Sequence, residues 1–335
     1  MTRRTFSHLL IFVLLAVGLS QASCEPRLPP LPPNAAKSFF KDPSKFSMNQ
    51  KPFPKSNPNQ FNFVVAGHIY GAHDDALPHP AQTLQDHLSD IVNLNPAMFV
   101  SLGDIVPHAT AADFDQLESQ IFSRITFPVF NTVGNHDVEN RALYESRYHR
   151  TNAAFRLGPA YLVYLDTQAN PCKITGDQLT MLQAALQYAV DDSYVLNIFV
   201  FMHNVIFVND PLLYESGSRL AAPNEWVCYD DNNYDELRTN IFLPAARIKP
   251  VYLFAGDVGA WGGNLSPYYQ KDPDANLTTI TTGIGDTPQD SLLEVLVNKD
   301  EVHFKVIGLG GQDPGPLEQY NLTYWQRVAG ETGKK

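Results

Sequence analysis

Short, uniformly apolar runs alternate along the chain with longer segments in which apolar residues recur every three or four positions. The short runs are typical of strands buried on both faces, and the longer segments are typical of helices that cover a sheet. We predict strands over residues 61–66, 98–102, 129–133, 160–165, 196–202 and 251–255, and a hairpin from 292–297 and 302–307. We predict helices over residues 83–94, 113–121 and 175–190, the last with Thr175 as its N-cap. This alternation predicts an α/β or α+β domain with a mostly parallel or mixed sheet.

The first residues of the chain have a different pattern. Arg3 and Arg4 precede an apolar run over residues 9–19, and small and polar residues follow as far as Cys24. This layout is typical of a secretory signal peptide, and the run is too short to span a bilayer as a helix. We therefore predict a signal peptide over residues 1–23 and an exported protein.

Two cleavage sites remain open. A cut after Ala22 would release a secreted or periplasmic protein. A cut before Cys24 would resemble the processing of a bacterial lipoprotein, in which Cys24 carries the lipid and anchors the chain to the cell envelope. A lipid on Cys24 is the one membrane contact that we expect.

The remaining chain divides into three parts by composition. Residues 24–60 are rich in proline, which favours an extended tether or linker. Residues 61–310 contain the strand and helix pattern and form the predicted domain. Residues 311–335 are expected to be a C-terminal tail.

Composition narrows the function. Of the 335 residues, 44% are hydrophobic, which is enough for a sizeable core. The net charge is −11 and no basic stripe is present, which argues against a nucleic-acid-binding surface. The chain has three cysteines. If Cys24 is lipidated, Cys172 and Cys228 remain, and an exported domain could pair them as a disulfide.

Polar side chains follow the predicted strands at the point where each strand ends. They are His68 and Tyr70, Asp104, the run Asn135-His136-Asp137, His203, and Asp257. Because ligands of open α/β sheets bind beyond the carboxyl ends of the strands, we expect these side chains to meet at one edge. Their nitrogen and oxygen donors suit a divalent metal such as Mn, Fe, Zn or Mg.

The order of these motifs resembles the calcineurin-like metallophosphoesterases. Gly103-Asp104, Gly134-Asn135-His136-Asp137 and the strand that ends in His203 carry the resemblance, which extends from about residue 61 to residue 307. The resemblance implies a four-layer double β-sandwich flanked by helices, with a two-metal site that hydrolyses phosphoesters.

The resemblance also implies a role for each matching residue. Asp104 would bridge two metal ions, and Asn135 and His203 would bind the second of them. His136 would donate a proton to the leaving group while held by Asp137.

The first and last motifs depart from the family pattern. The family begins with Asp-x-His where this chain has His68 and Tyr70, and it ends with Gly-His-x-His where this chain has Asp257 and Gly259. Asp257 would therefore join the second metal site. The first site would keep His68, with Tyr70 as a ligand or a hydrogen-bonding neighbour, and Gly259 can supply no ligand.

Two functional hypotheses follow. The leading one is an exported metal-dependent phosphoesterase that binds one or two Mn, Fe or Zn ions in a rebuilt site and acts on a phosphoester substrate. The alternative is a non-catalytic protein of the same fold that binds a ligand or partner in the cell envelope, and His68, Tyr70 and Gly259 motivate it.

Overall fold

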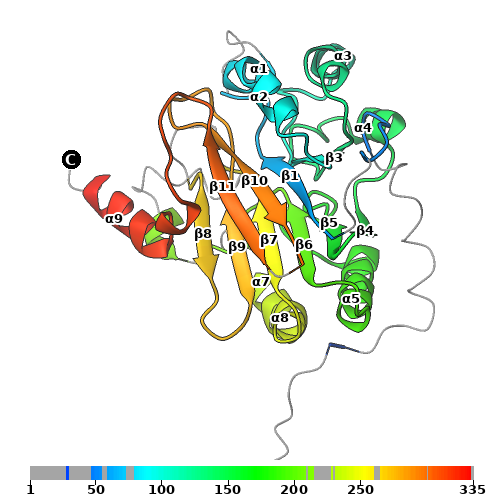
Figure 1. Ribbon diagram of the computed structural model, residues 1–335, viewed down its shortest axis with the longest axis vertical. Helices are drawn as coiled ribbons and strands as arrows, with labels where there is room; N and C mark the ends of the chain where they lie inside the picture. The colour runs from blue at the N-terminus through cyan, green and yellow to red at the C-terminus, as the bar shows by residue number, and fades with distance from the viewer. Residues whose placement is uncertain are drawn as a thin grey trace, which may run out of the picture.

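The computed structural model describes residues 28–29, 47–54, 59–72, 79–208, 210–214, 228, 231–259, 265–299 and 301–332. Two mixed β-sheets lie at the centre of the molecule (Figure 1). The smaller sheet has the order β11-β10-β1-β2-β3. Its strands are β1 (Phe61–Ala66), β2 (Phe99–Ser101), β3 (Val129–Asn131), β10 (Ser291–Val297) and β11 (Val302–Gly308). β1, β2 and β3 are parallel, whereas β10 and β11 form an antiparallel hairpin that pairs with β1.

The larger sheet has the order β4-β5-β6-β7-β9-β8. Its strands are β4 (Ala153–Leu157), β5 (Ala160–Tyr164), β6 (Asn197–Met202), β7 (Val251–Ala255), β8 (Tyr268–Lys271) and β9 (Leu277–Thr281). The four central strands are parallel, and β4 and β8 are antiparallel at the two edges. The protein is thus a mixed α/β structure, as the sequence pattern predicts.

Helices occupy the connections between strands. They are α1 (Gln82–Asp86), α2 (Leu88–Asn93), α3 (Ala111–Gln120), α4 (Arg141–Tyr148), α5 (Gly176–Asp191), α6 (Pro211–Tyr214), α7 (Tyr234–Leu237), α8 (Leu243–Ala246) and α9 (Leu322–Thr332). A π-helical turn, Arg238–Phe242, joins α7 to α8. No helix in the described part of the chain is long and apolar enough to cross a membrane.

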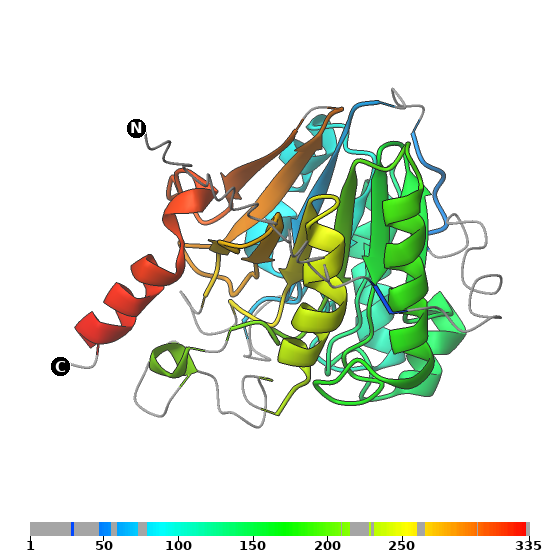
Figure 2. The ribbon, with the colours of Figure 1, turned by 90° about the horizontal axis from the view of Figure 1, so that it is seen from below.

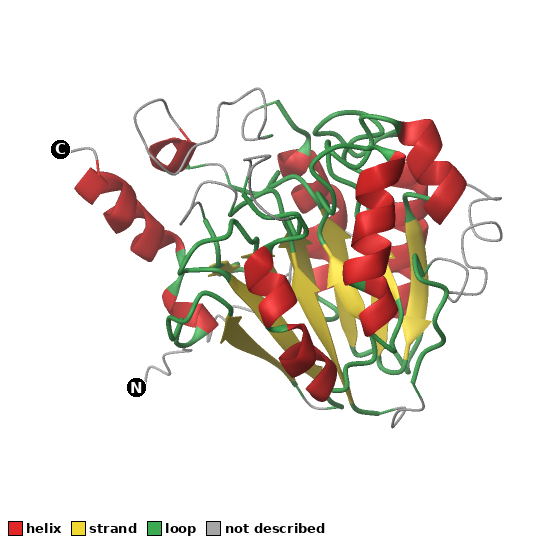
Figure 3. Cartoon of the chain, turned by 90° about the horizontal axis from the view of Figure 1, so that it is seen from above, coloured by secondary structure: helices red, strands yellow, loops and turns green. Residues whose placement is uncertain are grey.

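Three apolar clusters separate the layers. Alternate residues of β1 face opposite sides, so that Phe63 packs against the larger sheet while Val64 packs under α1–α4. In the same way, Phe199 of β6 faces the smaller sheet while Val200 packs under α5 and α8. The order of layers is therefore helix, sheet, sheet, helix. Figure 2 shows α5 and α8 on one side of the strands and the cyan helices on the other, and Figure 3 shows the strands between helices.

Two helical predictions need correction in detail. The predicted helix over 83–94 is divided into α1 and α2, because His87 leaves helical geometry (φ −101°, ψ 8°) and its Nδ1 donates to the Thr83 carbonyl oxygen at 3.1 Å. Thr175 is the N-cap of α5 by position, but its side chain does not cap the helix. Its hydroxyl oxygen instead accepts a hydrogen bond from Asn170 Nδ2 at 3.0 Å.

Parts of the two terminal segments pack on the domain. Within the Pro-rich segment, Met48 is buried and its N–H donates to the Val129 carbonyl at 2.8 Å, and Phe53 stacks on Phe130. In the segment after residue 310, Trp325 of α9 is buried and its Nε1 donates to the Pro267 carbonyl at 3.1 Å. The expected signal peptide and Cys24 lie outside the described residues.

The expected pairing of Cys172 with Cys228 is present as a disulfide with a sulfur–sulfur distance of 2.04 Å. Cys172 lies between β5 and α5, and Cys228 lies before α7 and is packed in the apolar cluster beneath the helices. The disulfide ties together two connections that are 56 residues apart in sequence.

Candidate metal centre

The loops after β1, β2, β3, β6 and β7 meet at one end of the two sheets. A Cβ atom on Gly67 would lie only 2.5 Å from the Cα of Gly256, and a Cβ on Gly103 would lie 2.3 Å from His203 Nδ1. Such distances are too short for any side chain, so the glycines after these strands permit the close approach. The sequence prediction that the strand-end residues converge is thus consistent with the structure.

Asp104 lies at the middle of the convergence. It is buried and adopts a left-handed backbone conformation (φ 53°) directly after Gly103 (φ 89°). Its Oδ1 accepts the backbone N–H of His136 at 3.1 Å. Its Oδ2 points between two histidines, 3.6 Å from His68 Nε2 and 3.5 Å from His203 Nε2. Burial raises the pKa of Asp104, but the nearby His203, His136 and His68 outweigh burial and lower it.

His203 is the other fixed point of the cluster. Its Nδ1 donates to the Leu102 carbonyl oxygen at 2.8 Å, which leaves Nε2 to present a lone pair when the ring is neutral. Nε2 lies 3.3 Å from Asn135 Oδ1 and 3.7 Å from Asp257 Oδ1. Burial lowers the pKa of His203, but the two carboxylates Asp104 and Asp257 outweigh burial and raise it.

These distances match a metal-binding arrangement. Four ligands placed tetrahedrally at about 2.0–2.2 Å from an ion lie roughly 3.3–3.6 Å apart. The donor atoms of Asp104, His203 and Asp257 all lie within 4.8 Å of one another, and Asn135 adds an exposed amide oxygen at the rim. Asp104, His203 and Asp257 are therefore candidate ligands for one divalent ion, and Asn135 Oδ1 lies close enough to His203 to be a fourth candidate.

Asp257 is oriented by an amide chain that the sequence motifs do not include. Asn204 Nδ2 donates to Asp257 Oδ2 at 2.9 Å, and Gln168 Nε2 donates to Asn204 Oδ1 at 2.7 Å. The Gln168 N–H in turn donates to Asp166, which pairs with Arg141 at 2.7 Å. Burial raises the pKa of Asp257 to about 6, against the opposing effect of His203. Asn204 directly follows His203 in sequence, and its position after a buried strand is the signal that could have indicated a role.

His68 and Tyr70 form a second, less complete group. His68 is buried, and its Nδ1 makes no hydrogen bond of normal geometry to a described residue, although the Gly71 backbone acts to raise its pKa. Burial dominates and lowers the pKa of His68 to about 4. The centroid of the Tyr70 ring lies 4.3 Å from that of the His68 ring and 5.1 Å from that of the His136 ring. Burial and Asp104 raise the pKa of Tyr70 far above its usual value, which favours a neutral phenol over a phenolate ligand.

Gly259 occupies a space that excludes a side chain. Its φ is 102°, and a Cβ atom there would lie 2.6 Å from the carbonyl carbon of Gly283. The loop after β7 therefore offers one candidate ligand, Asp257, and has no room for a second side chain two residues later.

The expected partnership between Asp137 and the His136 ring is wrong. Asp137 is fully buried, and its carboxylate accepts the backbone N–H groups of Asp104, Ile105 and Gly134 at 2.8–3.0 Å and the Asn131 amide at 3.1 Å. Oδ2 accepts three of these hydrogen bonds and Oδ1 accepts the fourth, so Asp137 fixes the two loops. The His136 ring is oriented instead by the Pro107 carbonyl, which accepts from Nδ1 at 2.6 Å.

A second group of possible metal donors adjoins His136. Glu139 lies 3.7 Å from His136 Nδ1 and 3.7 Å from His108 Nδ1. His136 Nδ1 already donates a hydrogen bond to the Pro107 carbonyl oxygen, so it is not available as a metal ligand. The other two residues of this group, His108 and Glu139, are exposed. The buried cluster around Asp104 is the better ligand set.

Comparison with known proteins adds no assignment, because no family model and no curated protein matches the chain.

Proposed function

We propose that the chain is an exported metal-dependent phosphoesterase whose site holds one divalent ion, Mn, Fe or Zn, on Asp104, Asn135, His203 and Asp257. The observation that carries the proposal is the convergence of the other three donors, from Asp104, Asn135 and Asp257, around His203 Nε2 at 3.3–3.7 Å. Two carboxylates, an amide oxygen and an imidazole nitrogen form a donor set that suits these metals. The proposal also rests on the resemblance of the motifs to the calcineurin-like metallophosphoesterases and on a fold of two packed sheets between helices.

The bound ion would polarise a phosphoryl oxygen and lower the pKa of a coordinated water, which is the chemistry that phosphoester hydrolysis requires. Protonation of the leaving group would be carried out by a side chain of the protein. His136 has its Nδ1 committed to Pro107, so a protonated ring presents its second proton on Nε2. The His136 ring is partly exposed beside the buried cluster, where it can donate that proton to a leaving-group oxygen.

A single ion is favoured over two by the first and last motifs. Beyond the shared Asp104, the first site would have His68, a neutral Tyr70 and no ligand at Gly259. His68 alone would be a weak addition to a shared carboxylate. We therefore propose one occupied site, with His68 beside it to accept or donate a hydrogen bond.

Export is supported by the disulfide between Cys172 and Cys228, because disulfides persist in oxidising compartments. Together with the signal pattern before Cys24, the disulfide favours the cell envelope or the extracellular space, with or without a lipid anchor.

Phosphoester hydrolysis tests the proposal directly. We expect the mature protein, loaded with Mn, Fe or Zn, to hydrolyse an aryl phosphate mono- or diester. The matched variant is His136→Asn, which keeps a polar side chain at the rim and should lose most of the activity while retaining the metal. Turnover equal in the wild type and in His136→Asn with all three metals would contradict the proposal.

The alternative is a non-catalytic protein of the same fold. The packing of Tyr70 between His68 and His136, and the absence of room at Gly259, favour it because they remove the second ion. Metal content separates the two functions. One bound equivalent that is lost in His203→Ala supports the phosphoesterase, whereas no bound metal supports the alternative.

A further inference from the structure

A cavity of about 310 Å³ lies on the outer face of the β8–β9 hairpin and shares no residue with the candidate metal centre. Residues two apart in a strand face the same side, and the register pairs Tyr268 with Thr281 and Gln270 with Thr279. Tyr268, Gln270, Leu277 and Thr279 thus form the floor of the cavity. The floor of the cavity is therefore formed by regularly paired residues of the β8–β9 hairpin.

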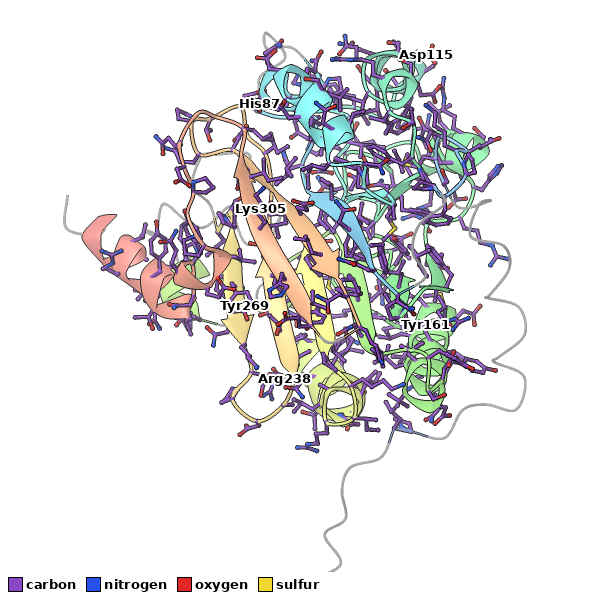
Figure 4. All side chains as sticks on the ribbon, viewed as in Figure 1. His87, Asp115, Tyr161, Arg238, Tyr269 and Lys305 are labelled. Carbon is purple, nitrogen blue, oxygen red and sulfur yellow. A yellow bond between two sulfur atoms is a disulfide. The ribbon has the colours of Figure 1, made fainter. Side chains whose placement is uncertain are left out.

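The wall of the cavity is formed by one helical turn and an ion pair. Tyr234 of α7 and Arg238 are four residues apart, so both face the cavity from the same side of the turn. Arg238 Nε donates to Asp272 Oδ2 at 3.1 Å, and a second guanidinium nitrogen contacts the same oxygen. This ion pair fixes the turn after β8 against α7. Figure 4 marks Tyr269 on β8 and Arg238 at the start of the π-helical turn next to α8.

Two tyrosines, Tyr234 and Tyr268, line this cavity. Tyr234 is 5% exposed and Tyr268 is 4% exposed. Neither hydroxyl makes a hydrogen bond within the part of the chain that the structure describes, although both side chains line the cavity. The two hydroxyls are therefore available to hydrogen-bond with polar groups of a molecule in the cavity.

The charges around the cavity define the class of that partner. Arg238 and Lys271 are balanced by Asp235 and Asp272, and the guanidinium is already engaged by Asp272. An anionic ligand would find no unopposed positive charge, whereas a neutral molecule with several hydroxyls would find both donors and acceptors. The volume corresponds to about ten water molecules, which is at the small end of ligand pockets and suits a single sugar ring.

We propose that this cavity binds a neutral ligand of monosaccharide size, whose hydroxyls pair with Tyr234 and Tyr268 and whose apolar face contacts Leu277 and Phe207. The site is independent of the proposed phosphoesterase activity, because its lining residues contribute nothing to the metal cluster.

Saturation-transfer NMR with the mature, metal-free protein tests the proposal. The probes are the methyl glycosides of glucose, galactose and mannose, with glucose 6-phosphate as the anionic comparison. We expect saturable binding of at least one neutral glycoside and weaker binding of the phosphate. Tyr234→Phe and Tyr268→Phe each keep the ring and its packing but remove the hydroxyl, and each should weaken binding by about tenfold.

The matched control is Tyr269→Phe, because Tyr269 is the neighbour of Tyr268 on β8 and packs on Phe304 at the opposite face of the sheet. It should bind the glycoside as the wild type does. The proposal is overturned if no neutral glycoside binds, if glucose 6-phosphate binds more tightly than all of them, or if both tyrosine variants bind like Tyr269→Phe. Thermal melting of each variant separates a loss of binding from a loss of folding.

Discussion

Asn204 orients the Asp257 carboxylate in the candidate metal site. Its side-chain amide is buried: Nδ2 donates to Asp257 Oδ2 at 2.9 Å, and Oδ1 accepts from Gln168 Nε2 at 2.7 Å. A hydrogen bond of this kind holds a carboxylate in the orientation that a metal ion needs. Asn204 thus belongs to the candidate site, although it lies outside the sequence motifs that predicted the site.

We expect Asn204→Ala to lower the affinity for Mn or Zn by about 10–100-fold, as for other residues that orient metal ligands. Titration calorimetry of the metal-free protein measures the change. The control is Asn276→Ala, which removes the same side chain just before β9 and should leave the affinity unaltered. Equal affinities for Asn204→Ala and the wild type would show that Asp257 needs no such support.

Asp137 and His136 are neighbours in sequence with separable roles. Asp137→Asn places an N–H donor among three backbone N–H groups, and we expect a loss of about 1–3 kcal/mol in the free energy of unfolding. His136→Asn should leave that free energy almost unchanged but lower the rate of hydrolysis by about 10²–10⁴-fold. Chemical denaturation and steady-state kinetics measure the two effects. An Asp137→Asn variant as stable as the wild type, yet inactive, would restore Asp137 as a partner of the His136 ring.

The identity of the site residues could be predicted because strand ends are visible in the sequence. The contacts of Asp137 could not, since they depend on the left-handed conformation of Asp104, which brings its N–H and that of Ile105 onto one carboxylate. Nothing in residue spacing distinguishes a carboxylate that holds a loop from one that holds a histidine ring.

At the scale of elements, the buried strands were the most predictable feature. β1 and β7 have the bounds that the apolar runs predict, because nearly all of their residues are apolar and buried on both faces. The edge strand β8 and its neighbour β9 contain Gln270, Lys271 and several threonines, and their sequences carry no continuous apolar run. They are strands because β9 pairs with β7 and β8 pairs with β9, which is information that the local pattern lacks.

The end of β7 provides a prediction about a second metal ion. We expect Gly259→His to destabilise the protein and to leave the number of bound ions unchanged, because the new Cβ would meet the backbone of Gly283 and the residue has φ 102°. Gly176→His is the matched control, since Gly176 also has a positive φ (58°) but has no atom within 4 Å of its Cβ position. It should be the milder change.

Thermal melting and metal analysis of the two variants measure these effects. A Gly259→His protein that is as stable as the wild type and binds a second ion would contradict this prediction. It would show that the loop after β7 can rearrange to accommodate a side chain at residue 259.

At the scale of the whole molecule, the candidate ligands come from both sheets. Asp104 and Asn135 follow β2 and β3 of the smaller sheet, whereas His203 and Asp257 follow β6 and β7 of the larger one. A bound ion would therefore link two layers that otherwise meet through apolar side chains. The pattern of buried strands predicts the layers only in class, because it does not show how the strands divide between two sheets. The four-layer arrangement was expected only from the family resemblance.

We expect this link to appear as a metal-dependent gain in stability. An ion at a free concentration one hundredfold above its dissociation constant should raise the free energy of unfolding by about 2.7 kcal/mol. Denaturation with and without Mn or Zn measures the gain. His203→Ala should abolish the gain, whereas His303→Ala, on the exposed face of β11, should retain it. A gain that persists in His203→Ala would place the ion elsewhere.

The disulfide constrains the molecule at a separate position and leads to the last prediction. Because Cys172 and Cys228 close a long segment of 56 residues, the bond should lower the entropy of the unfolded chain and stabilise the fold by about 4 kcal/mol. The double variant Cys172→Ser/Cys228→Ser should lose most of this free energy of unfolding. Reduction of the wild type should have the same effect, and the double variant should be insensitive to reductant. Both proteins should bind the metal with similar affinity, since neither cysteine contributes a donor to the cluster. A wild-type protein from the oxidising compartment that shows free thiols at both positions would contradict the pairing and, with it, the support that the disulfide lends to export.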